Sequence, residues 1–183
     1  ETAKAAGMQV IITDHHELPD TLPQCPIINP KMGNMGYKDL CGAGVALKLA
    51  AALLGQERAE KYFDLAAIAT IADIVPLTGD NRAIVKKGLE LINTNPREGV
   101  RQLALQSGLD LASKTLSSSD IAFILAPRLN AAGRISDPRL SLELFIDESK
   151  AKENAAILQE YNVKRQDIEN EILNQAIDMA YKS

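Results

Sequence analysis

Tryptophan is absent from this sequence of 183 residues, and aromatic residues together make up only 4% of it. Proteins that hold single strands by stacking bases on aromatic rings need several such side chains, so a stacking platform is poorly supplied here. A basic excess is also missing, because the formal net charge is −4 and the isoelectric point is about 5.3. Any recognition of phosphate groups must therefore be local or metal-mediated.

Long hydrophobic runs and zinc-type cysteine spacings are missing too. No apolar stretch approaches the roughly 18 residues of a membrane-spanning helix, so we expect no membrane contact. Cys25 and Cys41 lack the spacing of a CxxC or zinc motif, and we expect two reduced thiols in a cytoplasmic protein. The hydrophobic (46%) and charged (24%) fractions are those of an ordinary globular protein, which predicts one compact body.

Residues 8–13 predict a strand that is followed by a polar loop. This short run is almost continuously apolar and rich in β-branched residues, which is typical of a buried strand in a parallel sheet covered on both faces. In such sheets the polar residues just past the strand face the ligand crevice, and Asp14, His15 and His16 stand at that place.

The remainder of the chain is predicted to be mostly helical. Residues 17–40 contain four prolines and predict a loop, interrupted by a short strand at Ile27 and Ile28. Pro127 opens a segment that we expect to be irregular as far as Arg139. Apolar residues at helical spacing predict helices over residues 42–54, 59–72, 80–95, 98–107, 121–126 and 149–181, the last being a long polar helix that bridges to another domain.

Asp14, His15 and His16 can form part of a metal site. Neutral imidazole is a common metal ligand, and an adjacent carboxylate can orient the ring without binding the ion. A solvated polar turn is the alternative interpretation of these three residues. Asp73 favours the metal, because it is a lone carboxylate among apolar neighbours and a buried charge needs a partner. A turn cap before Pro76 is the alternative role for Asp73.

A mixed set of imidazole and carboxylate ligands fits manganese or zinc better than calcium. In two-metal hydrolases the ions activate water and brace the attacked phosphate. The histidine pair and Asp73 supply about half of the donors of a two-metal site, since octahedral ions take about six donors each. We therefore expect the remaining ligands upstream of Glu1.

Residues 126–134, with the sequence APRLNAAGR, form a second candidate site. Small residues there let the backbone approach a ligand, and Arg128 and Arg134 can each hold phosphate oxygens with the guanidinium fork. Pairing with surface acids is the commoner fate of an isolated arginine and is the alternative. Gly42 and Gly44 at a helix start can also bind an anion, but a short GxG motif is a weak signal.

Five segments together resemble one known family in order and spacing: ITDHH (12–16), INP (28–30), LCGAGV (40–45), IADIVPL (71–77) and PRLNAAGR (127–134). They are similar to the single-strand-specific DNA exonucleases of the DHH phosphoesterase superfamily. This resemblance covers nearly the whole chain and implies an α/β fold. It implies a DHH-type domain with a parallel sheet over residues 1–147, incomplete at its N-terminus and mostly helical after residue 41, and a long interdomain linker helix over residues 148–183.

The resemblance implies a metal-dependent enzyme that degrades single-stranded DNA from 5′ to 3′ in recombination and repair, with two Mn²⁺ or Mg²⁺ ions. His15 and Asp73 would bind one ion, His16 would lie near the scissile phosphate as a catalytic residue, and Asp14 would orient them. The DNA phosphates would be contacted from the second candidate site by Arg128 and Arg134 and, more weakly, by Asn130.

One departure from the family concerns the metal ligands. The family's Asp-x-Asp motif and a further bridging aspartate have no counterpart before Glu1, so we expect an incomplete site and no activity from this piece alone. Two alternative functions are a small-substrate DHH phosphoesterase, such as a pyrophosphatase or oligonucleotide nuclease, and a non-catalytic DHH-fold replication scaffold. The arginine segment favours the exonuclease, and retention of the histidine pair and Asp73 disfavours the scaffold.

Overall fold

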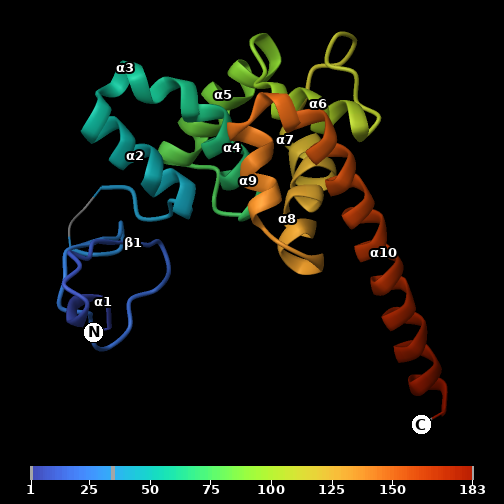
Figure 1. Ribbon diagram of the computed structural model, residues 1–183, viewed down its shortest axis with the longest axis horizontal. Coiled ribbons are helices and arrows are strands. Elements are labelled where there is room, and N and C mark those ends of the chain that lie inside the picture. Colours follow the sequence, from blue (N-terminus) through green and yellow to red (C-terminus); the bar gives the residue numbers. More distant parts are fainter. Residues whose placement is uncertain (1, 34–35, 183) are drawn as a thin grey trace. The chain divides into compact units, whose positions relative to one another are not determined.

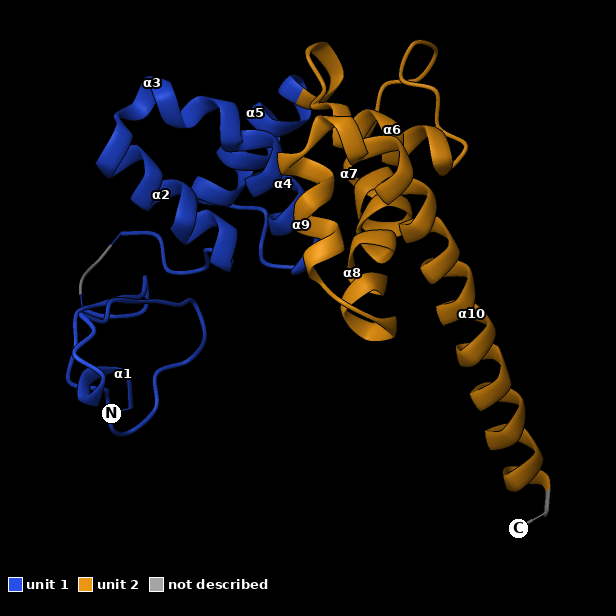
Figure 2. Cartoon of the chain, viewed as in Figure 1, with its two compact units in different colours: residues 1–91 blue, residues 92–183 orange. Residues whose placement is uncertain are grey.

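Two compact units, residues 1–91 and residues 92–183, make up the chain in the computed structural model (Figure 2). The structure describes residues 2–33 and 36–182, and most of them are helical (Figure 1). No helix in these described ranges combines the length and hydrophobicity that a bilayer crossing needs. The domain boundary that we expect between residues 147 and 148 stays a prediction.

The sheet of the first unit consists of two short parallel strands, β1 (Ile12–Thr13) and β2 (Ile27–Ile28). The strand at residues 27–28 and its parallel pairing are as predicted, but the predicted burial of residues 8–13 is wrong. Met8 is 63% exposed and Ile11 is 66% exposed. A parallel strand is covered on both faces only when further strands and crossover helices lie over it, and the described residues form one strand pair.

Helices form the rest of the first unit, and the first long one begins and ends at the residues that the sequence indicates. It begins where the thiol of Cys41 accepts a hydrogen bond from the backbone N–H of Gly44, and it ends at Gly55, whose φ of 87° favours glycine. Cys25 and Cys41 are both free thiols. The helical elements of this unit are α1 (Thr2–Ala5), α2 (Gly42–Leu54), α3 (Gln56–Ala59), η1 (Glu60–Tyr62), α4 (Phe63–Ala72) and α5 (Gly79–Thr94), the last of which runs past residue 91.

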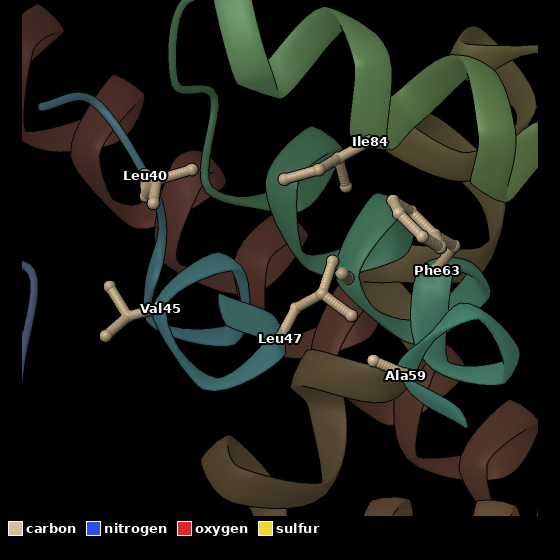
Figure 3. Packing of buried hydrophobic residues seen from close by; sticks show 7 residues of the cluster. Leu40, Val45, Leu47, Ala59, Phe63 and Ile84 are labelled. Carbon is tan, nitrogen blue, oxygen red and sulfur yellow. The ribbon is translucent and has the colours of Figure 1, made fainter. Parts of the chain in front are cut away.

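An apolar cluster packs α2, α4 and α5 together (Figure 3). Gly88 in α5 permits this close packing, because a Cβ there would lie 2.2 Å from the Cβ of Ala67 and 2.3 Å from the carbonyl oxygen of Phe63. The helix backbones therefore meet at Gly88, where a side chain has no room. The buried members of the cluster are Leu40, Val45, Leu47, Ala59, Phe63, Ala66 and Ile84.

The second unit contains α6 (Glu98–Gln106), α7 (Ser118–Asp120), η2 (Ile121–Leu125), α8 (Ala126–Ile135), α9 (Arg139–Ile146), η3 (Glu148–Lys150) and α10 (Ala151–Lys182). The first half of α10 packs against α6, α8 and α9. Ala151, Ala155 and Leu158 on this half are completely buried. Burying one large aliphatic side chain such as Leu158 contributes about 1.5–3 kcal/mol, so this half of α10 is part of the core.

The predicted long helix is confirmed by α10, which has 32 residues. Most apolar side chains of α10 are buried or half-buried in the first half of the helix, and those of the second half are exposed. Ile172 is 59% exposed and Met179 is 72% exposed, whereas the residues of the first half are buried. The second half of α10 therefore has little contact with the described part of the chain, and its role as a bridge to another domain stays a prediction.

The irregular segment expected after Pro127 is wrong, because residues 126–135 form α8. Ser117 and Asp120 form a capping box, and the chain continues from there through the π turn η2 into α8. Pro127 lies in the first turn of α8. The residues before Pro127 are already helical, so the helix continues through the proline, with a π turn directly before it that accommodates the missing N–H. A proline inside an expected helix was taken as its end, which is why the prediction failed.

Gly88→Ala should destabilise the protein by roughly 1–3 kcal/mol, the usual cost of forcing extra atoms into a packed core. Gly133→Ala is the matched control, since Gly133 lies inside α8 and its added Cβ would meet nothing nearer than 3.6 Å. The control should gain up to about 1 kcal/mol from the better helix propensity of alanine. Urea unfolding followed by circular dichroism measures both, and a Gly88→Ala protein as stable as the wild type would contradict the packing described.

Candidate functional site

The loop of residues 14–16 follows β1 directly and is fixed at both of its ends. The backbone N–H of Asp14 donates to the carbonyl of Ile28 in β2 at 3.0 Å. The side chain of Asn29 is buried and donates from Nδ2 to the carbonyl of His16, also at 3.0 Å. Asn29 therefore anchors the far end of the loop, a role that the sequence analysis missed and for which its place in the INP segment was the available signal.

The carboxylate of Asp14 organises this loop. Its Oδ1 accepts hydrogen bonds from the backbone N–H groups of His15 at 2.7 Å and His16 at 3.3 Å, and it lies 2.7 Å from Nδ1 of the His16 ring. The bond with the His16 ring, followed by the two backbone bonds, lowers the pKa of Asp14 to about 2. An ionised carboxylate only accepts hydrogen bonds, so Nδ1 of His16 carries the proton in this contact and Nε2 points away from it.

Asp73 reaches this loop from the end of α4, where it is the C-cap residue. Its Oδ2 lies 3.7 Å from Nδ1 of His15. The assumption that Asp73 is buried is wrong, because its side chain is 44% exposed at the helix end. Asp73 therefore ends a helix and also faces His15, and its role as a metal ligand stays a prediction. The next residue, Ile74, has a φ of 57°, which is unusual for a β-branched side chain.

The ring of His15 also packs against the start of α2. A Cβ added to Gly42 would lie 3.4 Å from Cδ2 and 3.7 Å from Nε2 of His15. The thiol of Cys41 lies 3.4 Å from the hydroxyl of Thr70, which connects the start of α2 to α4. The loop after β1, the start of α2 and the end of α4 thus build one site within the first unit.

The donor atoms of this site fit a divalent metal ion. Ligand atoms of Asp14, His15 and His16 all lie within 4.8 Å of one another, and His15 adds the close oxygen of Asp73. One nitrogen and one oxygen donor facing each other suit ions that accept mixed ligands, such as Mn²⁺. Asp14 already holds the ring of His16, so its carboxylate has the position of a group that orients a neighbouring side chain.

The three predicted phosphate-binding residues, Arg128, Asn130 and Arg134, all lie on α8 in the second unit. Asn130 and Arg134 are exposed, and Arg128 is half-buried. Arg128 donates from Nε to Oε1 of Gln159 and from Nη1 to the carbonyl of Ile124, each at 2.6 Å. Within residues 2–33 and 36–182 neither Arg128 nor Arg134 forms an ion pair with a carboxylate, so the alternative of a surface ion pair is not realised there.

A family model described as "DHH family, N-terminal domain" matches residues 1–72 of this chain. The single-stranded-DNA-specific exonuclease RecJ of Bacillus subtilis (strain 168) is 44% identical over 98% of this chain and 23% of its own length. The chain spans between 23% and 35% of the lengths of six RecJ relatives.

Solved RecJ structures share the fold of this chain. A crystal structure of exonuclease RecJ bound to manganese has a TM-score of 0.86 and 34% identity, over 97% of this chain and 46% of that chain. RecJ from Thermus thermophilus in complex with Mn²⁺ has a TM-score of 0.82 and 36% identity, over 93% of this chain and 26% of that chain. Its complex with Mg²⁺ has a TM-score of 0.76 and 35% identity, over 92% and 26% respectively.

The titration of Asp14 tests the hydrogen bonds of the loop. Its pKa of about 2 lies below the ordinary value of 3.8, so the contribution of the ionised carboxylate is complete above pH 3.8 and is lost as the pH falls through about 2. In His16→Ala the largest cause of the shift disappears, and the pKa of Asp14 should rise toward 3.8. Carboxyl ¹³C NMR measures this directly, and an unchanged pKa would show that the ring is not the main donor.

Proposed function

The chain belongs to the DHH family and matches RecJ proteins along nearly its whole length, and on this premise we propose that it is part of the catalytic core of a metal-dependent exonuclease. The proposed reaction is 5′-to-3′ hydrolysis of phosphodiester bonds in single-stranded DNA. The observation that carries the proposal is the meeting of His15 and Asp73, from two separate elements, beside the loop of residues 14–16. Because the chain spans at most about a third of its RecJ relatives, the activity is proposed for the complete protein.

Mn²⁺ or Mg²⁺ is the proposed cofactor, and RecJ structures bound to these ions support it. A bound divalent ion lowers the pKa of its water ligand and stabilises negative charge on the phosphate. In this chain His15 would offer Nδ1 and Asp73 would offer Oδ2 to one ion. His15 binds only as neutral imidazole, so protonation of its ring would compete with the metal.

His16 is proposed to act on the substrate. Its side chain is 75% exposed, and its Nδ1 is held by Asp14. The ring is therefore fixed in one tautomer, in which the lone pair of Nε2 can accept a proton, and only the protonated Nε2 can donate a hydrogen bond to the scissile phosphate. Asp14 would keep this geometry across the neutral range, since the hydrogen bonds of the loop hold the pKa of its carboxyl at about 2.

Arg134, Arg128 and Asn130 are proposed to hold the phosphates of the DNA. An arginine without a carboxylate partner keeps its full charge for an anion, and the guanidinium fork matches phosphate oxygens. The single-strand specificity stated in the names of the RecJ relatives supports the DNA substrate, and we propose that the complete protein acts in DNA recombination and repair in the cytoplasm. We also propose that residues 1–147 are the partial DHH domain and residues 148–183 the linker helix, which the continuous helix α10 supports.

The function is tested with the complete protein and a length series of single-stranded oligonucleotides. Mn²⁺ should start the release of nucleotides from long single strands, and Asp73→Ala should abolish it because one ligand oxygen is lost. Double-stranded DNA of the same sequence and inorganic pyrophosphate are the comparison substrates. Faster hydrolysis of dinucleotides or pyrophosphate than of long strands would contradict the exonuclease and favour a small-substrate phosphoesterase.

Two single variants should show that DNA binding and Mn²⁺ binding depend on different residues. Arg134→Ala should weaken single-strand binding by roughly 1–3 kcal/mol, the usual worth of a charge-assisted hydrogen bond, and leave Mn²⁺ affinity nearly intact. Arg134→Lys should restore only part of the affinity, because a point charge cannot reproduce the fork. His15→Ala should show the reverse pattern. Salt-titrated DNA binding and manganese calorimetry measure the two effects, and unchanged DNA affinity in Arg134→Ala would refute the phosphate contact.

A further inference from the structure

Arg128 differs from Arg139 and Arg165 of the second unit in what holds it. Arg139 lies against Asp137, and Arg165 lies against Glu169, so each faces a carboxylate. Arg128 is instead held by two neutral oxygens, Oε1 of Gln159 and the carbonyl of Ile124, both at 2.6 Å. Burial lowers the pKa of the Arg128 guanidinium, although an arginine stays protonated at neutral pH.

The carbonyl of Ile124, to which Arg128 donates, belongs to a π turn. Residues 121–125 form a π turn, in which the N–H of Ala126 bonds to the carbonyl of Ile121, five residues back. Pro127 has no N–H and leaves a further carbonyl of this turn without its backbone donor. The side chain of Arg128 reaches back and donates into this turn. π turns inserted in α-helices occur frequently at functional sites.

The residue of α10 that holds Arg128 is a neutral glutamine, Gln159, and this determines the net charge of the pair. Gln159 holds Nε of Arg128 with an amide oxygen and leaves the positive charge of the guanidinium uncompensated. A glutamate would hold the same atom more strongly but would neutralise it. Of the five N–H groups of a guanidinium, the two hydrogen bonds use two, so the remaining donors are free to face an anion.

We propose that Gln159 is a positioning residue for substrate binding, which fixes the guanidinium of Arg128 without neutralising it so that its remaining N–H groups hold a DNA phosphate. This inference rests on the proposed function and extends it to α10. Half-burial and two short hydrogen bonds remove the rotamer freedom that a surface arginine would lose on binding. The positive charge of the Arg128 guanidinium is not offset by any carboxylate in the described part of the chain. It therefore favours the binding of a negatively charged phosphate.

Gln159→Glu is the decisive variant, because positioning and mere structural support predict opposite results. The new carboxylate should hold Arg128 at least as firmly, so the melting temperature should stay equal or rise. Affinity for a 5′-phosphorylated oligothymidylate should nevertheless fall roughly tenfold, and the salt dependence of binding should lose about one phosphate contact. In the complete protein KM should rise with little change in kcat, since a ground-state contact is lost.

Two control variants test whether the loss of affinity comes from a carboxylate placed beside Arg128. Gln166→Glu makes the same change at an exposed position two turns along α10 and should alter binding much less. In an Arg128→Ala background, Gln159→Glu should have almost no further effect, which is the non-additivity expected of two residues in contact. Equal loss of affinity with and without Arg128, or wild-type affinity in Gln159→Glu, would overturn the proposal.

The result also distinguishes this inference from the proposed function. A wild-type protein that binds the oligonucleotide but does not hydrolyse it with Mn²⁺ would contradict the exonuclease, and the binding data on Gln159 would still decide the positioning role. A wild-type protein that does not bind the oligonucleotide would overturn both.

Discussion

The candidate metal site depends on a short stretch of backbone pairing between two strands of two residues each. The N–H of Ile12 bonds to the carbonyl of Pro26, the N–H of Asp14 bonds to the carbonyl of Ile28, and the amide of Asn29 bonds to the carbonyl of His16. These bonds hold the loop of residues 14–16 at both ends. Without them the ring of His15 would have no fixed position relative to Gly42 and Asp73, and the donor set would not exist.

Each candidate site contains a charged side chain that is held by neutral side chains or backbone groups. These partners do not offset its charge. Asp14 is held by N–H groups and by the His16 ring, which keep it ionised without a cationic lysine or arginine. Arg128 is held by an amide oxygen and a backbone carbonyl. Hydrogen bonds of this kind orient a charged group while its field still acts on a ligand, whereas a salt bridge would offset that field.

Most helix positions and the parallel strand pair were predicted from local signals, whereas the burial of the first strand was not. The limits of α2 at Gly42 and Leu54 depend on residues close in sequence, so the pattern alone indicated them. The burial of residues 8–13 and of Asp73 was wrong because burial depends on which distant segments cover a residue. The helix after Pro127 was missed because a proline that a π turn accommodates and a proline that ends a helix look alike in sequence.

The sequence by itself determined the chemical types of the site residues, the helical character of the chain after residue 41 and the resemblance to DHH exonucleases, since these are written in local patterns and motifs. Only the tertiary structure decided that Asp73 faces His15 at 3.7 Å, that Asn29 anchors the loop and that Gln159 holds Arg128. Asp73 lies 58 residues after His15, and Gln159 lies 31 residues after Arg128. Contacts at such separations depend on how helices pack, and no periodicity or spacing in one sequence records that packing.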